Sequence, residues 1–218
     1  MKRKRKKRVK TIFVMVLFIF AFFIVLKAIR SPLEVANRLN EQDSYDNVKK
    51  YEPFLRKELA KYQLQNYTPT LLAVMQQESK GEGGDPMQAS ESAGLKPNAI
   101  QNPEESIRRG VKHFQRALTY GKKEKVDFAT VIQAYNMGIG YIDFVKKHGG
   151  KHNEQLAKQF SLIQVHKKPD QYNCGGDKHN FRYPYCYGDF TYSTKVMENI
   201  KSITASLPAS KNQTDGSF

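Results

Sequence analysis

The sequence predicts an all-α domain that follows one N-terminal membrane-spanning helix. No segment alternates apolar and polar residues for long enough to indicate a strand, whereas several segments repeat apolar residues at helical spacing. Residues 11–26 carry no charge and no helix breaker, and snorkelling by Lys27 and Arg30 extends a bilayer-spanning segment to 11–29. We therefore expect a mainly helical fold and a membrane anchor.

The distribution of charge predicts the orientation of that anchor. The net charge is +15, of which residues 1–10 supply eight and Lys27 and Arg30 two more, leaving a surplus of +5 from residue 31 onward. Basic residues before an apolar span place the N-terminus in the cytoplasm and the remainder outside the cell. The surplus of +5 suits an anionic surface such as a bacterial wall, and it gives no reason to expect nucleic-acid binding.

A cleaved signal peptide is the alternative to the anchor. The segment after the apolar run has no convincing small-residue cleavage site, so an uncleaved anchor is favoured. The expected organisation is a cytoplasmic basic segment (1–10), a transmembrane anchor (11–29), a stalk (30–50), a catalytic domain (51–207) and a flexible tail (208–218).

The first predicted helices lead to an acid on an apolar face. Pro53 opens a short amphipathic helix, and Thr68 is expected to cap the next one, with a proline at its first position. Leu71, Met75 and Glu78 lie at positions i, i+4 and i+7, so they share one face of that helix. Glycines then end it.

Later helices are indicated by caps and apolar stripes. Asn102 caps the best-defined one, which continues to Gly121, and Asp127 caps the next. The remaining predicted helices cover residues 141–147, 153–166 and 191–207. Residues 167–190 are rich in proline, glycine and aromatic residues, and we expect an ordered flap there.

The flap contains both cysteines of the chain, Cys174 and Cys186. Two cysteines in a domain outside the cytoplasm, where conditions are oxidising, favour a disulfide. A zinc site that adds His179 is the alternative, but it lacks a fourth ligand and paired Cys-x-x-Cys spacing. We expect no metal and no cofactor.

Glu78 is the candidate catalytic residue. A carboxyl group held against apolar side chains loses solvation, which raises its pKa and keeps it protonated as a general acid. Asp85 follows in the loop, where it either assists the chemistry or shapes a turn.

Three stretches resemble one family of enzymes: QQES at 76–79, DPMQASES at 85–92 and AYNMGIG at 134–140. In this order and spacing they resemble the goose-type lysozyme and soluble lytic transglycosylase superfamily, and within it the lysozyme-like muramidase domain of Gram-positive cell-wall hydrolases. The segments SIRRGVKHF and YGDFTYSTKV also resemble that domain. The resemblance extends over residues 51–203.

The resemblance implies roles for particular residues. Glu78 would be the catalytic acid, assisted by Asp85. The residues expected to orient it or contact the sugar are Ser79, Met87, Gln88, Ser90, Tyr135 and Asn136. The substrate would be peptidoglycan glycan strands.

Two other functions stay open. If Asp85 is only structural, attack by the 6-hydroxyl of muramic acid gives an anhydro sugar, as in lytic transglycosylases; the loop reads DPMQ where those enzymes have GLMQ, which favours a muramidase. A non-catalytic scaffold in an envelope complex for division or conjugation is the alternative from another class. An intact buried acid argues against it.

Overall fold

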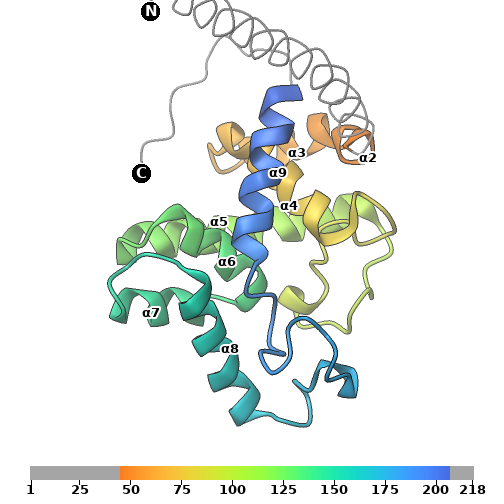
Figure 1. Cartoon of the computed structure of the whole chain (residues 1–218). Coiled ribbons are helices and arrows are strands. Elements are labelled where there is room, and N and C mark those ends of the chain that lie inside the picture. Colours follow the sequence, from red (N-terminus) through yellow and green to blue (C-terminus); the bar gives the residue numbers. More distant parts are fainter. Residues whose placement is uncertain (1–44, 207–218) are drawn as a thin grey trace, which may run out of the picture. The chain divides into compact units, whose positions relative to one another are not determined.

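The computed structural model describes residues 45–206, and this part of the chain contains helices and no strand (Figure 1). The all-α prediction is therefore confirmed for the described residues. The α-helices are α2 (Asp46–Lys49), α3 (Glu52–Ala60), α4 (Thr68–Ser79), α5 (Pro103–Glu124), α6 (Phe128–Met137), α7 (Gly140–Lys147), α8 (Glu154–Lys167) and α9 (Tyr192–Ser206). The short 3-10 helices are η1 (Gln65–Tyr67), η2 (Glu91–Ala93) and η3 (Cys174–Gly176).

The predicted anchor at 11–29 lies outside the described residues, as do the segments 1–10 and 208–218. Between residues 45 and 206, no helix is both long and apolar enough to cross a bilayer.

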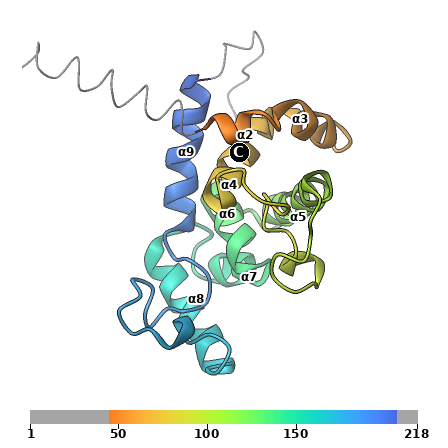
Figure 2. The ribbon, with the colours of Figure 1, turned by 90° about the vertical axis from the view of Figure 1, so that its right-hand side faces the viewer.

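Helix α4 forms the centre of the domain. Its residues from Leu71 to Met75 are all fully buried, as expected of a helix that is apolar on every side. Helix α9 runs beside α4 in both views, and α6 also packs against α9 (Figures 1 and 2). The C-terminal end of α4 and the N-terminal end of α9 thereby meet, which determines where the site is built.

Two predicted helix caps are confirmed, because Asn102 and Asp127 each accept hydrogen bonds from backbone N–H groups in the first turn of the following helix. Asn153, which was not predicted as a cap, caps α8 in the same way. The cap expected at Thr68 is wrong, because α4 already includes Thr68 and its N-cap is Tyr67. The Thr68 hydroxyl instead donates to the carbonyl oxygen of Gln65 at 2.6 Å.

The folded domain begins earlier than the expected boundary at residue 51. Tyr45 and Val48 are buried, and the Tyr45 hydroxyl donates to Oδ1 of Asn199 in α9 at 3.2 Å. The end of the predicted stalk (30–50) is thus part of the core.

Two glycines allow the loop after α4 to pack closely against its neighbours. A Cβ atom on Gly84 would lie 2.6 Å from the Cα atom of Gln101, and one on Gly81 would lie 2.7 Å from the carbonyl oxygen of Asn47. Gly81 also has a φ of +75°, which disfavours other residues. The predicted glycines therefore serve close backbone packing, whereas α4 itself ends at Lys80, which has a left-handed conformation with a φ of +58°.

The flap between α8 and α9 is closed by the predicted disulfide between Cys174 and Cys186. A disulfide that closes a loop this short contributes about 3 kcal/mol by restricting the unfolded chain. The zinc alternative is excluded, because it needs the two thiolates that the disulfide uses. Phe190 anchors the end of the flap in the core.

Candidate active site

Glu78 lies in the last turn of α4, and its side chain is half-buried. The hydroxyl of Tyr192, in the first turn of α9, donates to Glu78 Oε1 at 2.6 Å. The pKa of Glu78 is raised to about 7: burial is the largest cause, the hydrogen bond from Tyr192 acts to lower the pKa, and the charges of Asp85 and Glu91 act to raise it. The site therefore contains a carboxylic acid that is protonated near neutral pH, as the sequence indicated.

Asp85 is buried, and its side chain accepts hydrogen bonds from its own loop and from α5. Its Oδ1 accepts from the Ala89 N–H (2.9 Å) and the Ser106 hydroxyl (2.6 Å). Its Oδ2 accepts from the N–H (3.0 Å) and the hydroxyl (2.5 Å) of Ser90. Burial acts to raise the pKa of Asp85, but these hydrogen bonds together outweigh it and hold the pKa below its usual value.

Two further contacts join this loop to the end of α4 and to α5. The Ser79 hydroxyl donates to the carbonyl oxygen of Pro86 at 2.8 Å, and the Met87 N–H donates to the Ser106 hydroxyl oxygen at 2.9 Å. The end of α4, the loop and α5 are therefore held as one unit beside the acid.

Three residues of the loop that were expected to orient the acid or contact the sugar make contacts within the protein. The Met87 side chain is fully buried against Gly110, and Ser90 is 1% exposed, with its hydroxyl on Asp85. Gln88 is half-buried, and its Nε2 group donates to the Asp85 carbonyl oxygen and to Asn98 Oδ1. In this arrangement these residues shape the loop.

Tyr135, a predicted sugar contact near the end of α6, lies beside the loop. The Tyr135 hydroxyl donates to the Met87 carbonyl oxygen at 3.1 Å, and the charge of Glu78 contributes to raising the pKa of Tyr135, after the larger effect of burial. Asn136 is half-buried, and its Oδ1 accepts the Asp189 N–H at 2.7 Å. Asn136 thus connects α6 to the flap.

Sequence reasoning assigned no role to Tyr192, Ser106 or Gln133. Gln133 is fully buried and joins α6 to the start of α9, donating to the Asp189 carbonyl oxygen and accepting the Ser193 N–H. Tyr192 and Ser106 do lie in the two flanking segments that resemble the family. The resemblance of these two segments to the family could therefore have pointed to them. Only the packing of α9 and α5 shows that Tyr192 reaches Glu78 and that Ser106 reaches Asp85.

Glu91, at the start of η2, is an exposed carboxylate whose charge acts on Glu78. Asp85, the other acid whose charge acts on Glu78, is buried, so of these two acids it is Glu91 that faces solvent.

The family model for lysozyme-like proteins matches residues 45–200, which span the whole domain from its first buried tyrosine to α9. The chain belongs to the lysozyme-like family. The match starts at Tyr45, in agreement with the structural start of the domain.

Several relatives cover different shares of the chain. The uncharacterized membrane protein YocA of Bacillus subtilis is 46% identical over 98% of this chain and 97% of its own length. Pneumococcal vaccine antigen A of Streptococcus pneumoniae is 31% identical over 89% of this chain and 93% of its own. The bifunctional muramidase/DL-endopeptidase CwlT of B. subtilis is 39% identical over 66% of this chain, which spans only 39% of CwlT.

A solved structure gives the same fold. The crystal structure of a protein similar to lipoprotein, of the NLP/P60 family, from Staphylococcus aureus matches with a TM-score of 0.60 and 34% identity. The match covers 78% of this chain and 56% of that one.

Proposed function

We propose that this protein is a peptidoglycan hydrolase that cleaves the glycosidic bond between N-acetylmuramic acid and N-acetylglucosamine. The observation that carries the proposal is the Glu78 carboxyl group, which has a pKa of about 7 and is hydrogen-bonded to Tyr192 at 2.6 Å. Membership of the lysozyme-like family and the similarity to CwlT, a named muramidase, support a cell-wall substrate.

Glu78 acts as the general acid. Below about pH 7 its carboxyl group is protonated and donates to the glycosidic oxygen as the bond breaks, while positive charge develops on the muramic acid ring. Tyr192 bonds one oxygen of Glu78 and leaves Oε2 for the substrate.

In this mechanism Asp85 is a positioning residue. Both of its oxygens are occupied by donors from the protein, so it has no acceptor left to activate a water molecule. Glu91 is exposed, and its charge acts on Glu78. We therefore propose that Glu91 activates the water molecule that attacks the sugar. Asn136, which is half-buried beside the flap, is the proposed sugar contact from α6.

A lytic transglycosylase is the second candidate, and the saturated hydrogen bonding of Asp85 favours it. If no carboxylate holds a water molecule, the 6-hydroxyl of muramic acid can attack instead, giving an anhydro end.

Mass spectrometry of the fragments released from purified cell walls distinguishes these functions. We expect reducing muramic acid ends from the wild-type protein and a shift toward anhydro ends or lower activity from Glu91→Gln. Anhydro ends from the wild type would make it a transglycosylase. Binding of glycan without any released fragment would make it a scaffold.

Removing the Tyr192 hydroxyl is expected to change the pH profile. Its hydrogen bond lowers the pKa of Glu78, so in Tyr192→Phe that pKa rises further, and the loss of activity at alkaline pH moves to higher pH. The rate at the optimum should fall by about tenfold, because the acid is less well oriented. Fragment release measured across pH 5–9 tests this.

The control is Tyr62→Phe, which changes an exposed tyrosine of the domain. A slower Tyr192→Phe enzyme with an unshifted pH profile would show that Tyr192 acts only on structure.

We also propose that residues 11–29 anchor the protein with its domain outside the cell. The apolar segment, the basic residues before it and the membrane protein YocA among its relatives support this location. Protease added to intact protoplasts should digest the domain and spare the N-terminal segment, and protection of the domain would contradict the topology.

A further inference from the structure

A dense group of lysines lies away from Glu78, around the carboxyl ends of α5 and α7. Six lysines and three acids lie between residues 122 and 151; the lysines are Lys122, Lys123, Lys125, Lys146, Lys147 and Lys151. Four of these lie in the last turns of helices, where a cation offsets the helix dipole. Lys125 is the C-cap residue of α5, whereas Lys151 lies between α7 and α8, so the helix dipole does not account for Lys151.

The three acids of this region are already engaged. Glu124 pairs with Lys146, and Asp143 accepts the Tyr120 hydroxyl at 2.5 Å. Asp127 accepts the N–H groups of Thr130 (3.0 Å) and His152 (3.1 Å). Lys125 and Lys151 make no ion pair anywhere between residues 45 and 206, so the surface keeps a positive charge.

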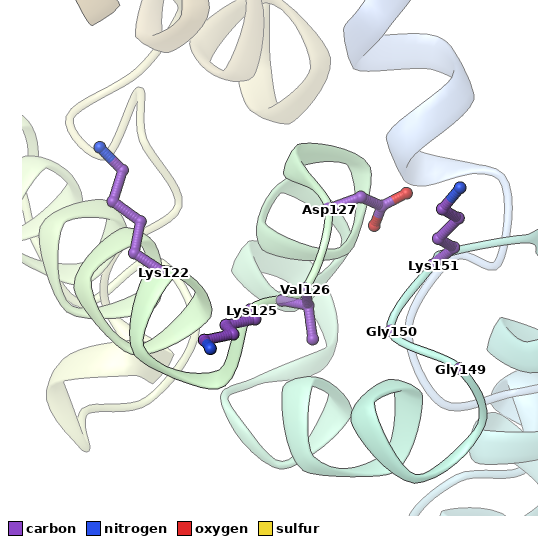
Figure 3. Close-up of a pocket in the computed structure, with 7 residues that line it drawn as sticks. All are labelled: Lys122, Lys125, Val126, Asp127, Gly149, Gly150 and Lys151. Carbon is purple, nitrogen blue, oxygen red and sulfur yellow. The ribbon is translucent and has the colours of Figure 1, made fainter. Parts of the chain in front are cut away.

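Three of the six lysines line an open hollow of about 650 Å³, which we name the lysine hollow (Figure 3). It is lined by Lys122, Lys125, Val126, Asp127, Gly149, Gly150 and Lys151. A hydrogen bond of 2.9 Å from the Asp127 N–H to the Gly150 carbonyl oxygen joins its two sides. Gly149 has open space where a Cβ would be, so no side chain covers the hollow at this point.

The ammonium groups of the three lining lysines point in different directions, and that of Lys122 lies 5.9 Å from the centre of the Tyr67 ring. Figure 3 shows Lys122 and Lys151 on opposite sides, with Lys125 between them, and their ends do not converge. A site for a single phosphate ion would need donors that meet at one point. Separate, exposed cations suit a chain of repeated anions, because each contact contributes only about 0–1 kcal/mol and several must act together.

We propose that the lysine hollow binds an anionic cell-wall polymer with repeating phosphodiester groups. The choice of a wall polymer rests on the proposed function. Asp127 and Tyr135 are eight residues apart at the two ends of α6, which corresponds to about 12 Å along the helix. The polymer would therefore lie beside the glycan-cleaving site without occupying it, and would hold the enzyme where glycan strands carry such polymers.

Co-sedimentation with cell walls tests the proposal. The full-length protein carries Glu78→Gln, so that the walls stay intact, and is mixed with walls that retain their phosphodiester polymers or with walls stripped by hydrofluoric acid. We expect stronger binding to the unstripped walls. The triple variant Lys122→Gln, Lys125→Gln and Lys151→Gln should lose about tenfold in affinity for them, and the remaining binding should match that to stripped walls.

The matched control removes the same charge from exposed lysines elsewhere, with Lys57→Gln, Lys167→Gln and Lys178→Gln. An equal loss in this control would show a general charge effect and overturn the proposal. Equal binding to both kinds of wall overturns it too, and lysine-dependent binding to phosphatidylglycerol vesicles instead would make the hollow a lipid contact. Fragment release from stripped walls, measured with Glu78 restored, should be equal in both triple variants, so a failure of the hydrolase proposal is detected separately.

Discussion

Glu78→Gln is expected to lower the release of glycan fragments from cell walls by at least about a hundredfold, because general acid catalysis typically contributes about 10²–10⁴ in rate. Glutamine has nearly the same shape and keeps an oxygen that accepts the Tyr192 hydroxyl, so the site should stay folded. It has no carboxyl proton to donate. Fragment release at pH 6, where the wild-type acid is protonated, is the measurement.

Glu82→Gln is the matched control, since Glu82 is an exposed acid four residues further along the chain. This variant should retain wild-type activity. Comparable activity of Glu78→Gln and wild type would remove Glu78 from the mechanism, whatever its pKa.

Asp85→Asn is expected to destabilise the domain by about 2–3 kcal/mol, seen as a lower urea midpoint for unfolding. Each Asp85 oxygen accepts one backbone N–H, from Ala89 on one side and Ser90 on the other. Whichever oxygen becomes the amide nitrogen, one buried N–H therefore loses its acceptor and faces another donor. Rotation of the amide cannot avoid this.

Activity should fall in the same variant, because the loop that Asp85 holds is bonded to the end of α4 through Ser79 and Pro86. Hydrogen exchange at the Ala89 and Ser90 amides should become faster. Asp170→Asn, which changes an exposed flap residue, is the control. Lost activity with unchanged stability and exchange would mean that Asp85 acts on the reaction and not on the loop.

Helix positions could be predicted because they depend on local patterns. Asn102, Asp127 and Asn153 cap helices through hydrogen bonds within a few residues, so a short stretch of sequence contains the whole signal. The cap at Thr68 was wrong for a related reason: a preceding 3-10 turn, η1, supplies another acceptor for its hydroxyl. The early start of the domain was missed because Tyr45 bonds to Asn199 in α9, about 150 residues later in the chain.

The sequence by itself determined that the domain is helical, that Cys174 and Cys186 can pair, and that Glu78 lies on an apolar helix face near a loop containing Asp85. These conclusions follow from periodicity, composition and short motifs. Only the tertiary structure decided which oxygen and nitrogen atoms meet. In that structure Tyr192 donates a hydrogen bond to Glu78, Ser106 and Ser90 donate to Asp85, and the Met87 side chain is buried. The physical reason is that hydrogen bonding and desolvation act over a few ångströms between segments far apart in sequence, so the chemical state of each acid depends on packing that no local pattern specifies.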